Sequence, residues 1–256
     1  MSPSFSGVVV LEDAAAVARE GAVRFAALAR DAVSAHGAFH VALSGGKTPA
    51  AMYRVLASDE FRGKLDWNRI HLYWSDERSV APDHPDSNFG MANRELIAKV
   101  TIPAGNIHRM EAERTDPDRA AQEYEAKLRK GIPSGPGGFP CFDLIYLGMG
   151  PDGHTASLFP GSVGLNEKSR GVIFQPVIIA DGSPSRRMTF TFPLLNAARV
   201  VLFLVTGADK TQKLREVLEG KHTPPYPSQC VCPSAGERIF LADRAAAAGL
   251  DAGTRP

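Results

Sequence analysis

Short apolar runs alternate with longer stretches of mixed polarity along this chain. The apolar runs have the length and the flanking turn residues of buried strands, and they lie at residues 8–11, 39–43, 70–74, 142–147, 172–175, 188–192, 200–205 and 239–241. Between them we expect helices at about residues 14–35, 50–56, 87–100, 116–130 and 211–218. Asp13 is the expected N-cap of the first helix, and Asp243 that of an Ala-rich terminal helix.

Strands that alternate with helices predict an α/β fold. We expect a doubly wound, mostly parallel, Rossmann-like sheet flanked by helices, with a smaller second lobe. Residues 131–140 hold four glycines and three prolines, which is typical of a loop or a lobe boundary. With 256 residues, 44% of them hydrophobic, the chain is long enough to form one domain over residues 1–256.

Charge and composition exclude several classes of protein. A net charge of +1 gives no attraction to nucleic acid or to an anionic membrane. The sequence contains neither a secretory signal nor an apolar run long enough to span a bilayer, so we expect a soluble, cytoplasmic protein. The three cysteines, Cys141, Cys230 and Cys232, form neither a disulfide framework nor a zinc site, and no metal is predicted.

The stretch from residue 142 to residue 161 holds the densest chemistry. Its apolar run ends at Gly148, and the polar turn that follows contains three glycines, Asp152 and His154. Thr155 and Ser157 are expected to open a helix. Because open α/β sheets bind ligands where strands end, His154 is a candidate functional residue.

A second turn has the character of a phosphate site. Ser44, Gly45, Gly46 and Thr48 follow a predicted strand and precede a helix, so backbone N–H groups and the helix dipole favour an anion there. Lys210 lies in a similar strand-to-helix turn, and Arg187 lies beside a predicted strand; both could add charge-assisted contacts. The alternative is a plain tight turn with two solvated cations.

Other motifs do not fit their known patterns. The sequence Gly46-Lys47-Thr48 resembles the end of a nucleotide-binding loop, but Val41 stands where the first glycine is required. The Gly148-x-Gly150-x-x-Gly153 spacing matches a dinucleotide fingerprint, yet Pro151 and Asp152 occupy positions that need bare backbone. Neither a Gly-x-Ser-x-Gly elbow nor a His-Glu-x-x-His metal motif occurs.

Five blocks of sequence, in order, give the chain a nearly end-to-end resemblance to the 6-phosphogluconolactonase family. This family belongs to a wider group that includes glucosamine-6-phosphate deaminases. The most specific block is Gly-x-Asp-Gly-His-Thr-Ala-Ser-Leu-Phe-Pro-Gly, at residues 150–161. The other blocks lie at residues 43–49, at 76–78 with His84 and 87–88, at 187–189 and at 206–210.

The resemblance implies hydrolysis of 6-phospho-D-glucono-1,5-lactone to 6-phosphogluconate, the second step of the oxidative pentose phosphate pathway, without a cofactor. His154 would be the general base, a role that suits an imidazole. Either Asp152 or Asp76 would orient it, and Arg78 would either stabilise the oxyanion or brace its loop. Arg187, Lys210 and the turn of residues 44–48 would bind the phosphate. The partner implied is a small sugar-phosphate lactone, and the protein would be a monomer or a small homo-oligomer.

Two other functions are weighed against lactone hydrolysis. Deaminases similar to this chain carry a glutamate five residues after the histidine, where this sequence has Phe159. Phenylalanine cannot relay a proton, so the resemblance favours the lactonase branch. A sugar-phosphate sensor without turnover predicts loss of the histidine or its acidic neighbours, and His154, Asp152 and Asp76 are all retained.

Overall fold

The computed structural model describes residues 6–179 and 181–254. Its strands are β1 (Ser6–Leu11), β2 (Phe39–Leu43), β3 (Ile70–Trp74), β4 (Asp76–Arg78), β5 (Leu144–Leu147), β6 (Val172–Ile178), β7 (Pro184–Phe190), β8 (Val200–Val205) and β9 (Glu237–Asp243). Its α-helices are α1 (Ala14–His36), α2 (Lys47–Leu56), α3 (Asn88–Glu95), α4 (Pro117–Gly131), α5 (Phe192–Leu195), α6 (Thr211–Glu219) and α7 (Pro227–Cys230). Short 3₁₀ turns include η2 (Ile97–Lys99), η5 (Val163–Asn166), η6 (Ala208–Lys210) and η7 (Ala246–Gly249).

The larger sheet is parallel and confirms the predicted fold class. Its six strands lie in the order β1-β9-β8-β5-β2-β3, and every pair runs parallel. From β2 the chain moves to one edge of the sheet at β3, whereas from β5 it moves towards the other edge through β8 and β9. The direction of winding therefore reverses between β2 and β5, and ligands bind at such a point at the carboxyl ends of the strands.

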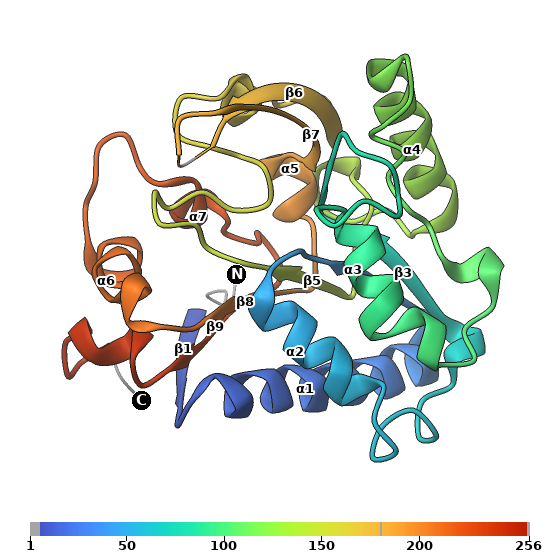
Figure 1. The fold of residues 1–256 in the computed structure, drawn as a ribbon, viewed down its shortest axis with the longest axis horizontal. Helices are drawn as coiled ribbons and strands as arrows, with labels where there is room; N and C mark the ends of the chain where they lie inside the picture. Colours follow the sequence, from blue (N-terminus) through green and yellow to red (C-terminus); the bar gives the residue numbers. More distant parts are fainter. Residues whose placement is uncertain (1–5, 180, 255–256) are drawn as a thin grey trace.

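Helices α1 and α2 pack together along one side of the molecule, and Figure 1 shows them apart from the smaller sheet. Asp13 caps α1 as predicted, accepting a hydrogen bond from the Ala16 N–H at 2.8 Å. All four residues of β5 are buried. The buried hydroxyl of Tyr146 finds a hydrogen-bond acceptor in the Gly21 carbonyl of α1, at 2.8 Å. This bond fixes the central strand against the helix beneath it.

The second, smaller sheet is antiparallel, in the order β4-β7-β6, and lies on the other side of the molecule in Figure 1. Strand β4 follows β3 after a single residue, Ser75, so it leaves the carboxyl end of the parallel sheet directly. Its register with β7 sets Arg78 opposite Arg187 and Asp76 opposite Thr189. The small sheet thus brings candidate residues that are far apart in sequence to one edge of the large sheet.

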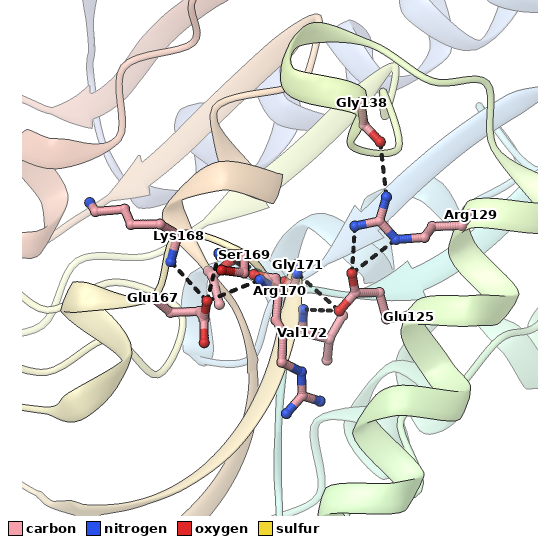
Figure 2. Close-up of polar contacts among 10 residues, drawn as sticks. Glu125, Arg129, Gly138, Glu167, Lys168, Ser169, Arg170, Gly171 and Val172 are labelled. Atoms are coloured by element: carbon pink, nitrogen blue, oxygen red, sulfur yellow. Dashed lines mark hydrogen bonds and ion pairs between the residues drawn. The ribbon is translucent and has the colours of Figure 1, made fainter.

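A buried carboxylate joins α4 to the small sheet. Glu125 of α4 accepts hydrogen bonds from the backbone N–H groups of Gly171 and Val172, at 3.0 and 3.1 Å, where β6 begins (Figure 2). Its other oxygen accepts two bonds from Arg129, one turn later on α4. The side chain of Glu125 is 11% exposed, so this network replaces the water that the carboxylate and the strand would otherwise need.

Three helix predictions need correction. No helix begins at Thr155 or Ser157; residues 155–162 form turns before η5. The helix expected over residues 87–100 ends at Glu95 and continues as the 3₁₀ turn η2. The terminal helix is only the single 3₁₀ turn η7, although Asp243 does accept a bond from the Ala246 N–H at 2.7 Å.

Within residues 6–179 and 181–254, no helix combines the length and apolar character needed to cross a bilayer.

Candidate active site

A cavity of about 450 Å³ opens at the carboxyl ends of β2, β5 and β8. Turns after all three strands contribute to it: residues 44–49 follow β2, residues 148–156 follow β5, and residues 206–210 follow β8. The predicted site residues on its wall are Ser44, Gly45, Gly46, Thr48, Asp76, Arg78, His154 and Lys210. Of the remaining two predicted site residues, Asp152 contacts this wall through His154 and Arg187 lines an adjoining hollow.

His154 and Asp152 form a closely bonded pair. The Nδ1 atom of His154 lies 2.6 Å from Oδ1 of Asp152, which also accepts a bond from the His154 backbone N–H at 3.2 Å. Burial raises the pKa of Asp152, but the hydrogen bond and the charge of His154 outweigh that effect, so this pKa lies below its usual value. With Nδ1 engaged by the carboxylate, Nε2 is the ring nitrogen left to act on a ligand.

Gly150 permits this pair to form. A Cβ atom on Gly150 would lie 2.1 Å from His154 Nδ1 and 2.7 Å from Asp152 Oδ1, so both side chains would have to move. The turn is closed by bonds from the Gly150 N–H to the His154 carbonyl and from the Gly153 N–H to the Gly150 carbonyl. Gly150 therefore leaves the room that the histidine and its carboxylate occupy.

Asp76, the other candidate for orienting His154, is bonded elsewhere. It is buried, and its Oδ2 accepts a bond from the Ser157 hydroxyl at 2.6 Å. Its Oδ1 lies 3.3 Å from Nδ2 of Asn88, which also donates to the Asp76 carbonyl. Among the described residues, the carboxylate that hydrogen-bonds His154 is that of Asp152.

Arg78 and Arg187 lie side by side in the small sheet and share a second hollow of about 340 Å³. Asp76, Arg78 and His154 line both this hollow and the main cavity, so the two adjoin. Burial lowers the pKa of Arg187, and the positive charge of Arg78 lowers it further. Two facing cations repel one another, so an anionic ligand here would relieve an unfavourable contact.

The guanidinium of Arg78 has one nitrogen that is hydrogen-bonded to the backbone and another that is unpaired. Its Nη1 donates to the Asp86 carbonyl at 2.5 Å, which fixes the polar loop that leads to α3. Its Nε is buried and has no hydrogen-bond partner among the described residues. A buried donor without a partner is costly, and the side chain of Arg78 lines the cavity beside it.

The turn after β2 has the geometry of an anion site. Gly46 is the N-cap of α2 with φ +111, and no side chain caps the helix. Ser44 is 4% exposed, yet its hydroxyl has no partner among the described residues. Gly45 packs against Asn88, because a Cβ atom at residue 45 would lie 1.9 Å from the Asn88 amide oxygen. Ser44, the first residues of α2 and Lys210 line one space.

Lys210 and Thr48 line this space from two different turns, after β8 and after β2. Lys210 is 20% exposed, and its Nζ lies 3.3 Å from the exposed carboxylate of Asp209. Thr48 Oγ1 lies 2.7 Å from Oγ1 of Thr206, which joins the turn after β2 to the turn after β8. The predicted turn, lysine and histidine are thus brought together around one cavity.

Several residues that shape the site were not predicted. Asn88 connects Asp76 with the turn after β2, and Ser157 bonds Asp76. Glu77 is buried and accepts backbone bonds from Arg78, Asn88 and Phe89, so it folds the polar loop onto α3; burial raises its pKa. All three residues lie in the sequence blocks that carry the family resemblance, but those blocks give no indication of these pairings.

Comparison with known proteins identifies the family. A family model described as glucosamine-6-phosphate isomerases/6-phosphogluconolactonase matches residues 12–240. The chain is 43% identical over 220 residues to a 6-phosphogluconolactonase of Nostoc sp., with 86% of this chain and 88% of that one covered. A 6-phosphogluconolactonase of Synechocystis sp. is 44% identical over the same shares.

The fold agrees with this match. The structure of 6-phosphogluconolactonase from Trypanosoma brucei superposes with a TM-score of 0.86 at 26% identity and covers 97% of this chain and 100% of its own. The chain therefore belongs to the glucosamine-6-phosphate isomerase/6-phosphogluconolactonase family.

Proposed function

We propose that this protein hydrolyses 6-phospho-D-glucono-1,5-lactone to 6-phosphogluconate, as in the oxidative pentose phosphate pathway. The observation that carries the proposal is the bonded pair of His154 and Asp152 at a cavity that is also lined by a phosphate-type turn and by Lys210. The relatives from Nostoc and Synechocystis, both named 6-phosphogluconolactonase, support the same reaction.

The phosphate end of the substrate would bind at the turn after β2. The N–H groups at the start of α2 and the Lys210 ammonium supply donors and positive charge around one space, which Ser44 also lines. Arg78 and Arg187 add positive charge from the adjoining hollow. This arrangement suits a small dianion at one end of an uncharged sugar ring.

The hydrolytic step would use the free nitrogen of His154. Asp152 holds Nδ1 with its hydrogen, which leaves the Nε2 lone pair to accept a proton as water attacks the lactone carbonyl carbon. The carbonyl oxygen becomes an oxyanion, and the guanidinium of Arg78, which lines the cavity, is a donor suited to it. As the tetrahedral intermediate collapses, the bond from the carbonyl carbon to the ring oxygen breaks. Nε2 then returns its proton to that oxygen.

Phe159 argues against deamination of an amino sugar. The ring of Phe159 stacks on the His154 ring with centroids 4.0 Å apart. The resemblance expects a glutamate at this position in a deaminase, and a phenyl ring in the same place carries no proton. Its stacking instead packs one face of the imidazole against an apolar surface.

The test is a comparison of two substrates. Freshly generated 6-phosphogluconolactone should be hydrolysed well above its spontaneous rate, whereas glucosamine 6-phosphate should release no ammonia under the same conditions. Ammonia release without lactone hydrolysis would assign the protein to the deaminase branch. Turnover of neither substrate would favour the sensor.

A further inference from the structure

The turn that carries His154 is held from outside by a segment that the catalytic proposal does not use. Helix α7 places Ser228 against this turn, and Ser228 is fully buried. Its backbone N–H and its hydroxyl both donate to the Gly153 carbonyl, at 3.0 and 2.9 Å. The same hydroxyl lies 3.4 Å from the His154 carbonyl. Two donors on one carbonyl restrain the peptide immediately before the histidine.

The ring of Tyr226 packs on the same turn, against Gly153. Gly153 has φ +79, and a Cβ there would lie 2.8 Å from Cδ1 of the Tyr226 ring, so the ring packs directly on the glycine backbone. The Tyr226 hydroxyl donates to Glu216 at 2.8 Å, and Lys213 Nζ lies 3.8 Å from the ring centroid. Both of these partners belong to α6.

Helix α6 begins directly after Lys210. The contacts of Tyr226 with α6, and those of Ser228 with Gly153, therefore form a continuous connection between the proposed phosphate-binding lysine and the proposed general base. Gln229 strengthens it, since its side chain donates to the carbonyls of Glu216 and Gly220 at 3.2 and 3.0 Å.

We propose that Ser228 is a positioning residue for catalysis: its hydroxyl fixes the Gly153–His154 peptide and holds His154 in place relative to α6 and Lys210. The proposal rests on the proposed function of His154. Ser228 lines neither hollow of the site, so it acts only through the turn. Loosening this turn should reduce the rate of the chemical step and leave substrate binding intact.

Thr191 offers a matched control. It too is fully buried, its N–H donates to the Gly171 carbonyl, and its hydroxyl donates to the carbonyls of Arg170 and Gly171. It lines neither hollow. Ser228→Ala and Thr191→Val each remove one buried hydroxyl with the same kind of bonds, so they should cost similar stability.

The first experiment measures kcat and KM for lactone hydrolysis in these variants. Ser228→Ala should lower kcat by about 10- to 100-fold with KM within about twofold of native, a loss typical of a misplaced catalytic group. Thr191→Val should leave both constants near native. Ser228→Cys keeps the volume with a weak donor, so its kcat should lie between those of Ser228→Ala and the native protein. Native kcat in both Ser228 variants, or an equal loss in Thr191→Val, would overturn the proposal.

A second experiment separates this proposal from the proposed reaction. Amide hydrogen exchange of the peptide that contains residues 148–158 should be faster in Ser228→Ala than in the native protein and unchanged in Thr191→Val. Unchanged exchange in Ser228→Ala would refute the restraint whatever the substrate. Faster exchange in a protein that does not hydrolyse the lactone would retain the restraint and reject the reaction.

Discussion

Gly150 shows how strictly single positions define this site. The distance from His154 Nδ1 to Asp152 Oδ1 is 2.6 Å, and the space beside that bond is too small for a methyl group at residue 150. A glycine in a glycine-rich turn is easily attributed to backbone flexibility. Here the close approach of two catalytic candidates requires it.

Gly150→Ala should therefore separate the histidine from its carboxylate. We expect kcat to fall by about 100-fold, the loss that follows from displacing a catalytic group by about 1 Å. Gly105→Ala is the control, because a Cβ at that glycine meets nothing within 4 Å. The measurement is kcat for lactone hydrolysis with circular dichroism as a check of folding. Native kcat in Gly150→Ala would show that the pair is dispensable.

Lys210 should act in binding and not in the chemical step. Lys210→Met keeps the apolar stem and removes the charge, so KM should rise by about 10- to 100-fold, the value of a charge-assisted hydrogen bond or two. The value of kcat should stay within about twofold of native, because a remote phosphate is held equally in ground and transition states. Lys130→Met, at an exposed position of α4, is the control. A fall in kcat at constant KM would reject the assignment of Lys210.

At the level of elements, the parallel strands could be predicted and the loop after His154 could not. Runs such as β5 and β8 are apolar throughout and almost entirely buried, so their sequence alone defines them. Thr155 and Ser157 looked like a helix start because their hydroxyls suit an N-cap. In the structure the Thr155 hydroxyl instead donates to the Gly148 carbonyl, and the Ser157 hydroxyl donates to Asp76. Long-range bonds of this kind compete with a helix and leave no local signal.

Strand β4 could not be predicted from the sequence, for a related reason. Its three residues, Asp76–Arg78, are polar and have no alternating apolar pattern, so the sequence read as a loop. Pairing with β7 makes them a strand and brings Arg78 next to Arg187. The residue types of the candidate site could thus be named from the sequence, whereas the choice of Asp152 over Asp76 as the partner of His154 required the fold.

The link between α4 and the small sheet depends on Glu125. Glu125→Gln places an amide against backbone N–H donors, so the free energy of unfolding should fall by about 1–3 kcal/mol, the cost of leaving buried donors unpaired. Glu123→Gln, on the same helix but with exposed partners Arg114 and Arg119, should have a smaller effect. Urea unfolding measures both. An equal effect in the two variants would show that the buried network of Figure 2 adds nothing specific.

On the scale of the whole molecule, the end of the sheet opposite the active site holds a cluster of histidines. His40 of β2 stacks on His71 of β3 with ring centroids 5.1 Å apart, and His71 Nδ1 lies 3.2 Å from His108 Nε2. Burial lowers the pKa of His40 to about 4, helped by the charges of His71, His36 and His108. Burial and the charges of His71 and Lys127 likewise lower the pKa of His108 to about 4.

This cluster should make the protein sensitive to acid. An unfolded histidine titrates near pH 6.5, so between that pH and about pH 4 the unfolded chain binds more protons than the folded one. The free energy of unfolding should therefore be fully retained above about pH 6.5 and decrease as the pH falls towards 4. Urea unfolding at a series of pH values measures this slope. His40→Gln should flatten it and His222→Gln, an exposed control, should not. An identical slope in native protein and His40→Gln would exclude His40 as its source.

The most direct test of the account is the rate of lactone hydrolysis by His154→Ala, measured above the spontaneous rate. Loss of a general base typically costs about 10²- to 10⁴-fold, so the variant should retain little of the native rate while remaining folded. His36→Ala, which removes a histidine bonded to Asp143 and lining neither hollow of the site, should stay close to native. Equal rates in His154→Ala and native protein would contradict the assignment of His154 as the base and, with it, the proposed mechanism.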